Sequence, residues 1–571
     1  MFKNLTSIER NDLWKSNEET FWCTYIHSAS YKDRADSMVI NGYNGILLGK
    51  GILLNTEKEI TSLLMESGDQ DIVDKYTDLI SNKKMLEIEY SKPLDNRSQN
   101  IDSLEKRIDR IERYLVENVK VYGDITKNLN ISWQDVQSKL KSTDVGVEFV
   151  SFPWTVDSTM YVAYVLKKGM DCPKLVPLFE EKQLKKDNRL YTTSSVSKLV
   201  WEPLAEYMEG IENVYFAPSG ELYNIGIESL PHWNEDCLMS DKWNMYRLSS
   251  TRQLAIVKDK SSLKHASVYG GVKYDTKEDL LLADSKRYQS GERSFNYELF
   301  EIADSLNLRS GAAYLPATKI EAEEIDRTLE QKKIATTLKL DTLATEGAFK
   351  DLSGKKTNLL HIATHGFYWT EKEAQYSKNL DFLMLGDNQP KYVEDKALTR
   401  SGLLLAGANN ALMGKKLPEG VDDGILTAKE ISQLDLRGLD LVVLSACETG
   451  LGEIKGDGVF GLQRGFKKAG ANSLLMSLWK VDDNATQLLM TRFYKNLTSG
   501  MSKFESLRQA QKYVREYEVE IEVKSDNRPS VSAHAREQAQ QNVNKEKVFK
   551  KVKKYEDPKY WAAFILLDAI D

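Results

Sequence analysis

The sequence is poor in cysteine and contains no long hydrophobic run. Its 571 residues include only Cys23, Cys172, Cys237 and Cys447, which are far apart and form no C-x-x-C pair. This spacing argues against a disulfide framework and a zinc site, and it is typical of a reducing intracellular compartment. No apolar run approaches about 18 residues, and Met1–Thr6 has no apolar core of signal-peptide length. We therefore expect a cytoplasmic protein without a membrane segment.

Several functional motifs are also missing. The chain has a formal net charge of -7 and therefore lacks the excess of positive charge that is typical of nucleic-acid-binding proteins. We expect no nucleic acid partner. There is no H-E-x-x-H motif and no EF-hand loop to hold a metal. The glycine-rich segment Gly456 to Gly461 precedes a predicted helix, but it lacks the lysine–hydroxyl pair of a P-loop and the spacing of a dinucleotide-binding turn. We interpret it as part of a flexible active-site loop and expect neither cofactor nor metal.

A change of hydrophobic period divides the chain, which is too long for one hydrophobic core. Residues 1–144 are predicted to form a helical domain. From residue 145 to 571 strands alternate with helices, which predicts a mainly parallel sheet covered by helices on both faces. The polar segments 275–312 and 370–400 are expected to be exposed loops. Within the helical domain, a heptad stripe too short for a free coiled coil predicts packing against neighbouring helices, and its members are Ile101, Leu104, Ile108, Ile111 and Leu115.

Two predicted strands end in residues that can carry chemistry. Leu439 to Gly450 passes from β-branched and leucine residues into small and polar ones, and Cys447 lies at this change. Thr357 to Gly366 follows the same pattern and places His365 at its carboxyl end. Ligands of parallel sheets bind beyond the carboxyl ends of the strands. If these two strands are neighbours, His365 and Cys447 form a thiolate–imidazole dyad.

Such a dyad would make the sulfur a nucleophile. A free thiol is only a few per cent ionised near neutral pH, because its pKa is about 8.5. An imidazole that takes the proton activates the sulfur toward an acyl carbon. The backbone N–H groups of Gly366 and Cys447 would then supply the oxyanion hole, and the missing Cβ of Gly366 would let substrate approach. The alternative is that Cys447 is a small buried residue and His365 a hydrogen-bonded core histidine.

Other polar residues near the two strands have competing interpretations. His361 lies within the apolar strand, four residues before His365, and we interpret it as a core histidine rather than the base. Trp479, Asp482 and Asp483 follow the next strand along the chain. The two aspartates are ordinary caps for the following helix, or they form an acidic pocket that pairs with a substrate Arg or Lys. One of them could cap while the other binds.

Five motifs follow one another along the second part of the chain. They are LHIATHG from Leu360, LSACETG from Leu444, GVFGLQR from Gly458, SLWKVDD from Ser477 and YWAAF from Tyr560. In this order they closely resemble the CHAT family of caspase-like peptidases, over roughly residues 145–571. The helical segment before them resembles the region that commonly joins tetratricopeptide repeats to CHAT domains, with the repeat array absent or reduced to a remnant.

The resemblance implies a caspase/separase-like α/β fold and a His–Cys dyad, carried onto His365 and Cys447. In the related separases, an acidic residue just after a matching Leu-Trp motif lines the pocket for a basic residue. This implies Asp483, or as the alternative Asp482, as the pocket acid beside Trp479. Cleavage after Arg or Lys, rather than after Asp, is the expected specificity.

These observations lead to three hypotheses of different kinds. The leading one is a regulated intracellular cysteine endopeptidase that cleaves a protein partner and is activated by a signal or by a regulatory protein bound to the N-terminal helices. The second is a catalytically silent caspase-like scaffold that acts as a protein-interaction or signalling module. The third is acyl transfer on a non-peptide amide, which would share the dyad but not the acidic pocket.

Overall fold

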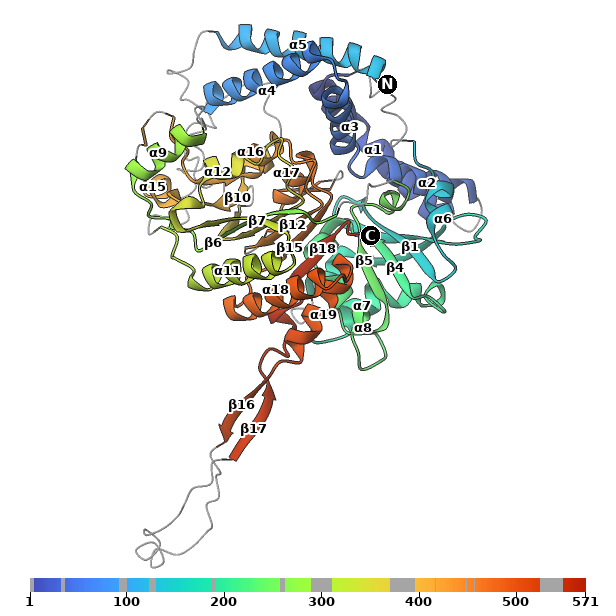
Figure 1. Ribbon diagram of the computed structural model, residues 1–571. Coiled ribbons are helices and arrows are strands. Elements are labelled where there is room, and N and C mark those ends of the chain that lie inside the picture. The colour runs from blue at the N-terminus through green and yellow to red at the C-terminus, as the bar shows by residue number, and fades with distance from the viewer. Residues whose placement is uncertain are drawn as a thin grey trace, which may run out of the picture.

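The computed structural model shows a broad twisted sheet, helices on both of its faces, an arm of N-terminal helices and one projecting hairpin (Figure 1). Among the described residues, no helix is long and apolar enough to cross a membrane. The structure describes residues 5–31, 36–91, 100–122, 130–186, 190–256, 262–288, 311–369, 396–415, 417–418, 420–446, 449–455, 458–523 and 548–570.

The N-terminal segment is helical throughout its described parts. The predicted stripe of α5 is packed as expected, with Ile108 and Leu115 fully buried against Leu64 of α3 and Leu79 of α4. A capping box at Ser132 starts the last of these helices. The six helices are α1 (Ser7–Tyr31), α2 (Asp36–Gly49), α3 (Ile52–Glu66), α4 (Gln70–Ser91), α5 (Ile101–Tyr122) and α6 (Trp133–Lys139).

The main sheet has eleven strands in the order β3-β2-β1-β4-β5-β18-β15-β12-β8-β6-β7. Most neighbouring pairs are parallel, as predicted. The strands are β1 (Asp144–Thr155), β2 (Ser158–Lys167), β3 (Lys174–Glu180), β4 (Asn213–Ala217), β5 (Asn244–Arg247), β6 (His265–Gly270), β7 (Ala335–Leu340), β8 (Leu359–Ala363), β12 (Leu441–Ser445), β15 (Ser473–Ser477) and β18 (Phe564–Leu567).

The last strand joins two parallel blocks that run in opposite directions. β18 is parallel to β5 but antiparallel to β15. Its first residue, Phe564, therefore pairs with the last residue of β15, Ser477. As a result, the start of β18 lies at the same sheet edge as the carboxyl ends of β8, β12 and β15.

Helices cover both faces of the block that contains β8 and β12. Successive strand residues point to opposite faces, so Val443 packs toward α11 (Pro316–Gln331), α18 (Asp483–Thr498) and α19 (Lys503–Arg515). Val442 and Leu444 pack toward the other face, where α12 (Glu346–Lys350), α16 (Ala428–Ser432) and α17 (Leu462–Lys468) lie (Figure 1). The expected α/β architecture with helices on both faces is confirmed.

The other block shares a core with the N-terminal arm. Tyr43 and Ile46 of α2 pack with Trp133 of α6 against Phe152 of β1 and Tyr164 of β2. The predicted boundary at residue 144 coincides with the first residue of β1, shortly after the end of α6. The division into domains 1–144 and 145–571 stays a prediction.

Three segments expected to be loops contain regular structure, and in the segment 370–400 this is α14 (Lys396–Thr399). Residues 278–288 form α9 (Glu278–Tyr288), whose Leu281 is buried, so the expectation of an exposed excursion is wrong there. The helix docks closely, because a Cβ on Gly407 would lie 2.6 Å from the Leu281 side chain. The glycine-rich segment Gly456–Gly461, expected to be part of a flexible loop, contains β14 (Gly458–Phe460), which pairs with β13 (Glu453–Lys455). Residues 289–310, 370–395 and 456–457 lie outside the described residues.

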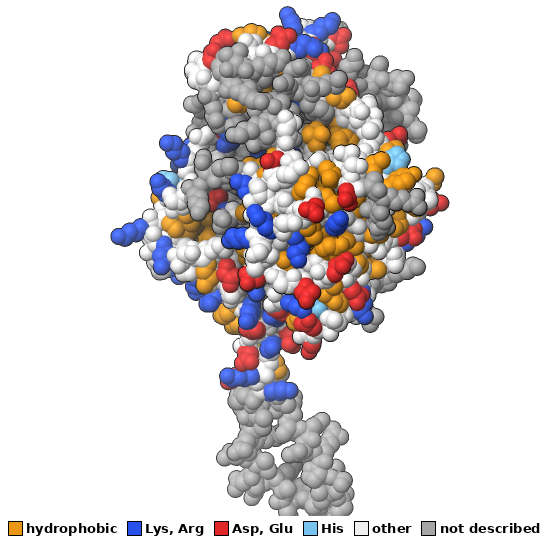
Figure 2. Space-filling model, turned by 90° about the vertical axis from the view of Figure 1, so that its right-hand side faces the viewer, with side chains coloured by type: hydrophobic (Ala, Val, Ile, Leu, Met, Phe, Trp, Pro, Cys, Tyr) orange, Lys and Arg blue, Asp and Glu red, His pale blue; other side chains and the backbone are white. Residues whose placement is uncertain are grey.

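Two further small sheets complete the fold. β9 (Gly366–Tyr368), β10 (Ser401–Leu404) and β11 (Ile425–Thr427) form a three-stranded antiparallel sheet that begins directly after His365. β16 (Glu518–Val523) and β17 (Val548–Lys553) form a hairpin that projects away from the body, with Lys and Glu side chains on its neck (Figures 1 and 2).

Candidate active site

His365 lies immediately beyond the carboxyl end of β8. Its Nε2 atom is 2.8 Å from the backbone carbonyl oxygen of Ala313. A carbonyl oxygen only accepts hydrogen bonds, so Nε2 is the protonated ring nitrogen and Nδ1 carries the lone pair. The histidine is thus held in one tautomer with Nδ1 as its basic atom.

Tyr274 fixes the backbone that carries this histidine. Its hydroxyl lies 2.9 Å from Thr364 Oγ1 and accepts the His365 N–H at 3.3 Å. The Thr364 hydroxyl in turn donates to the Leu404 carbonyl. Tyr274 is buried, and its ring centroid is 5.2 Å from that of His365. This polar chain ties the end of β8 to β10.

Gly366, the first residue of β9, pairs with Leu403 of β10. At the neighbouring position the Leu404 N–H donates to the His365 carbonyl at 2.9 Å. Hydrogen-bonded and non-hydrogen-bonded pairs alternate along an antiparallel ladder. The Gly366–Leu403 pair is therefore of the non-hydrogen-bonded kind, and the Gly366 N–H points away from β10.

β12 is the direct neighbour of β8, as the sequence hypothesis requires. Their register pairs Ser445 with Ala363. In the sequence, Cys447 stands two residues after Ser445, and His365 stands two residues after Ala363. On the far side of Cys447, Thr449 is fully buried, and its hydroxyl accepts the Ser477 N–H at 3.2 Å. Cys447 itself and Glu448 lie outside the described residues.

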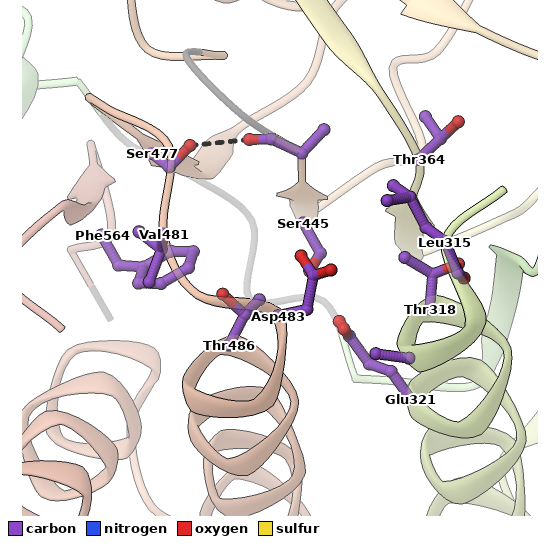
Figure 3. Close-up of a pocket in the computed structure, with 12 residues that line it drawn as sticks. Leu315, Thr318, Glu321, Thr364, Ser445, Ser477, Val481, Asp483, Thr486 and Phe564 are labelled. Carbon is purple, nitrogen blue, oxygen red and sulfur yellow. Dashed lines mark hydrogen bonds between the residues drawn. The ribbon is translucent and has the colours of Figure 1, made fainter. Parts of the chain in front are cut away.

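A cavity opens at this sheet edge (Figure 3). Its volume is about 420 Å³, including the part open to solvent. The carboxyl ends of β8, β12 and β15 supply one wall, and the amino-terminal parts of α11 and α18 supply another. Its lining is formed by Leu315, Ala317, Thr318, Glu321, Thr364, Ser445, Ala446, Ser477, Val481, Asp483, Thr486 and Phe564.

The two candidate pocket aspartates have different positions. Asp482 is the N-cap of α18, and its Oδ1 accepts the N–H groups of Asn484 at 3.1 Å and Ala485 at 3.0 Å. Asp483 is exposed, belongs to the first turn and lines the cavity (Figure 3). Acidic residues are favourable in a first helical turn because of the helix dipole. Of the pair, Asp482 caps the helix and Asp483 faces the cavity.

Trp479 lies beside the cavity but does not line it. Its indole N–H donates to the Lys559 carbonyl at 3.0 Å, and its ring packs at 5.0 Å from that of Tyr191. These contacts attach the segment after β15 to two other parts of the chain. The predicted role of Trp479 in substrate binding stays a prediction.

Glu321 of α11 also lines the cavity, and the sequence reasoning missed it. Its side chain is 2% exposed, and Oε1 is 3.1 Å from Nε2 of His361. His361 is fully buried in the strand, as expected for a core histidine. The missed signal is positional, because Glu321 stands four and eight residues before the buried Ile325 and Leu329. Charged residues are rare on the apolar, buried stripe of a helix, so a glutamate at such a position indicates a functional site.

Close packing brings α11 to this position. A Cβ on Gly270, the last residue of β6, would lie 2.4 Å from the Thr318 carbonyl oxygen. The Thr318 hydroxyl accepts the Gly271 N–H at 3.0 Å. The absence of a side chain on Gly270 thus lets the first turns of α11 approach the sheet edge and place Glu321 at the cavity.

The other cysteines show no comparable arrangement. Cys172 is buried, and burial raises the pKa of its thiol. Burial also raises the pKa of Cys237, whose neighbour His232 stacks against Trp233 and Trp243. Within the part of the chain that the structure describes, no group of three or more His, Cys, Asp or Glu side chains could hold a metal ion.

Comparison with known families identifies the class of protein. The sequence pattern of the CHAT domain family matches residues 192–569, about two thirds of the chain. The chain therefore belongs to the CHAT domain family, as its five motifs predict.

Individual relatives share smaller parts of the chain. Tetratricopeptide repeat protein 28 is 38% identical over 92 residues in Mus musculus and 35% identical over 91 residues in Homo sapiens. Each match covers 16% of this chain and 4% of the relative, so the chain spans a small part of the length of these proteins.

Two solved structures show distant similarity. The Arg-specific cysteine proteinase gingipain R matches with a TM-score of 0.31 and 8% identity, over 56% of this chain and 62% of its own. The separase–securin complex of Saccharomyces cerevisiae matches with a TM-score of 0.36 and 10% identity, over 89% of this chain and 44% of its own.

Proposed function

We propose that this protein is a regulated cysteine endopeptidase that cleaves a protein partner after a basic residue. The observation that carries the proposal is the 2.8 Å contact between His365 Nε2 and the Ala313 carbonyl. It leaves Nδ1 as a proton acceptor at the edge where the neighbouring strand leads into Cys447.

The first half of the proposed reaction acylates the enzyme. His365 Nδ1 takes the Cys447 thiol proton, and the sulfur forms a bond to the scissile carbonyl carbon. The carbonyl oxygen becomes an oxyanion that accepts hydrogen bonds from the N–H groups of Gly366 and Cys447. The register that turns the Gly366 N–H away from β10 supports this role. The His365 imidazolium then donates its proton to the leaving amine as the C–N bond breaks.

The second half releases the acyl group. His365 deprotonates a water molecule, which attacks the thioester carbon. The C–S bond breaks, and the sulfur recovers a proton from the imidazolium. The products are a carboxylic acid and an amine, and every proton moves between Cys447, His365, water and the substrate, so the proposed steps require no cofactor and no metal ion. A thiol nucleophile suits the reducing, cytoplasmic compartment that the cysteine content predicts.

The acidic cavity supports a basic residue on the amino side of the cleaved bond. Asp483 lines the cavity, and Thr364, one residue before His365, lines the same cavity. A carboxylate in this position would pair with an Arg or Lys side chain while the adjoining carbonyl reaches Cys447. Because Asp482 is engaged as the helix cap, we assign the specificity role to Asp483.

We also propose that a protein partner regulates the site through the N-terminal arm. Helix α3 packs on α17, where Glu57 Oε1 lies 2.7 Å from Lys468 Nζ. Helix α17 directly follows the β13–β14 hairpin, and this hairpin follows Cys447 in the chain. A partner that moves α3 would therefore act on the segment next to the nucleophile.

The test is to incubate the protein with candidate protein partners encoded by neighbouring genes and to map new amino termini by mass spectrometry. We expect cleavage after Arg or Lys with the wild-type protein and none with the Cys447→Ala variant. If the partner is not cleaved and Cys447→Ala keeps the biological output, the chain acts as a catalytically silent scaffold instead.

A further inference from the structure

The cavity at the sheet edge holds two carboxylates on two different helices. We propose that Glu321 and Asp483 together select a guanidinium group, so that the pocket prefers Arg to Lys and Glu321 is the residue that determines this preference. The inference deepens the proposed function and rests on it for its biological meaning, but the ligand preference of the cavity is a separate property.

Glu321 is a buried acid whose ion-pair partner among the described residues is a histidine, His361. Its side chain is 2% exposed, and its Oε1 atom makes no hydrogen bond there. The nearest cationic candidate is His361, whose Nε2 is 3.1 Å away but poorly aligned, and both of its ring nitrogens also lack a hydrogen-bond partner in this region. An unsatisfied buried carboxylate is costly. A donor supplied by a ligand would remove that cost.

The surroundings of Glu321 offer it little compensation. Tyr494 is fully buried behind it, and the pKa of this phenol is raised by burial and by the negative charge of Glu321. The ring of Tyr494 packs edge-on against His361 at 5.5 Å. None of the described residues that line the cavity is Lys or Arg. The cavity thus carries acidic groups and no fixed cation, which favours a cationic ligand.

The two acids enter the cavity from facing helices. Figure 3 shows Asp483 at the start of α18 and Glu321 on α11, both beside Ser445. The helices are held together further along, where the Thr491 hydroxyl of α18 donates to Glu324 Oε2 of α11 at 2.8 Å. The spacing of the two carboxylates is therefore set by helix packing rather than by a mobile loop.

A guanidinium group suits this arrangement better than an ammonium group. A guanidinium group is planar and presents five N–H donors in a fixed fork. It is also more weakly hydrated than an ammonium group, so it loses less hydration free energy on entering a buried site. One face of the fork can donate to Asp483 at the open end while the tip donates to Glu321 at the buried end. An ammonium group is a compact point charge that stays with the exposed Asp483 and leaves Glu321 unsatisfied.

The experiment measures binding of agmatine and cadaverine to the full chain by isothermal titration calorimetry. Agmatine carries the guanidinium group of an Arg side chain, and cadaverine carries the ammonium group of a Lys side chain. Their binding does not depend on any reaction of Cys447. We expect the wild-type protein to bind agmatine at least tenfold more tightly than cadaverine. Glu321→Gln should remove most of this difference, and Asp483→Asn should weaken both ligands.

Glu324→Gln is the matched control. It changes an acid one turn further along α11 that bonds to α18 and does not line the cavity, so the agmatine preference should persist. If Glu321→Gln does not fold by circular dichroism, Glu321→Asp keeps the charge but withdraws it by one methylene and should still reduce the preference.

Two results would overturn the inference. One is the absence of agmatine binding to the wild-type protein, and the other is an equal effect of Glu321→Gln on both ligands. Failure of the proposed function gives a different result, because agmatine would then bind with the predicted preference while Arg-containing partners remain uncleaved.

Discussion

At the scale of single residues, the site depends on how His365 is held. The carbonyl of Ala313 fixes the tautomer, and the Tyr274 hydroxyl fixes the backbone. The position of His365 could be predicted from its place at a strand end. Ala313 could not, because it comes from a segment 52 residues earlier whose approach is decided by tertiary packing. Glu321 was hidden for a related reason, since a single acid in an acidic helix looks solvated until its burial is known.

The first prediction concerns Tyr274. Tyr274→Phe removes the hydroxyl that bonds to Thr364 and to the His365 N–H, which loosens the histidine without removing it. A typical net hydrogen bond contributes about 1 kcal/mol, so we expect a three- to tenfold loss, roughly, in kcat with little change in KM. Hydrolysis of an Arg-containing fluorogenic peptide measures it.

Tyr269→Phe is the control for this variant. Tyr269 lies on β6, is equally buried and donates its own hydroxyl to the Ala348 carbonyl at 3.0 Å. It loses one hydrogen bond without touching His365. Equal losses of activity in the two variants would show that Tyr274 acts through general stability only.

At the scale of secondary-structure elements, a buried cluster of acids supports the small sheet beside His365. Lys350 of α12 pairs with Glu346, Asp422 and Glu430, and Asp423 lies buried among them. The Asp423 Oδ1 accepts the Ile425 N–H at 2.8 Å, where β11 begins. Burial and the neighbouring carboxylates raise the pKa of Asp423 to about 8. Because one lysine cannot neutralise several buried carboxylates, the cluster keeps a proton.

This cluster makes stability depend on pH. In the unfolded chain Asp423 loses its proton near its ordinary pKa of about 3.9, while the folded protein holds it until pH 8 or so. The unfolded state therefore binds fewer protons between these limits, and the free energy of unfolding falls as pH rises, by up to about 1.4 kcal/mol per pH unit. Stability from this group is full below pH 4 and lost above pH 8.

Asp423→Asn removes this dependence while its amide oxygen can still accept the Ile425 N–H. We expect the variant to gain stability relative to the wild type as pH increases from 5 to 8. Urea unfolding at several pH values measures the difference. Parallel curves for the two proteins would contradict the assignment of the proton to this cluster.

The elements themselves were predictable to different degrees. The apolar runs of β4, β8 and β15 stand between turn residues, and the structure places strands there. The short strands β5 and β9 have too few residues to show a period, and they form because a neighbouring strand offers its edge. The reversed direction of β18 was not predictable, because an apolar run of four residues fits either orientation.

At the scale of the whole molecule, the arm meets the half of the sheet that holds His365 where α3 packs on α17. Glu57 and Lys468 are 30% and 16% exposed, and their pairing links α3 to α17. A partly buried pair of this kind contributes about 0.5–1 kcal/mol. In the proposed regulation, this pair matters for its place near the β13–β14 hairpin rather than for its energy.

Charge reversal tests this link. Glu57→Lys and Lys468→Glu should each change the rate of peptide hydrolysis, and the double variant should restore it because the pair is re-formed with exchanged charges. The exposed pair Asp351–Lys355, exchanged in the same way, serves as the control. Unchanged rates of peptide hydrolysis in both single variants would contradict the proposal that the α3–α17 contact affects the active site.

The projecting hairpin is the part of the molecule that the fold needs least. The Lys554 N–H donates to the Tyr517 carbonyl at 2.9 Å, so the two ends of the excursion are adjacent. Replacing residues 518–553 by two glycines should change the melting temperature by only about 2–4 °C, since none of the described residues of this segment belongs to the two main hydrophobic cores. An insoluble product, or a loss of more than about 10 °C, would show that the hairpin supports the body.

The central claim is that His365 activates Cys447 for attack on an acyl carbon. It is tested most directly by treating the protein with an Arg-containing acyloxymethyl ketone peptide and mapping the adduct by mass spectrometry. We predict one adduct, on Cys447, that forms at least 100-fold more slowly, as an order of magnitude, in His365→Ala. An adduct that forms equally fast without His365, or that spreads over Cys23, Cys172 and Cys237, would contradict the claim.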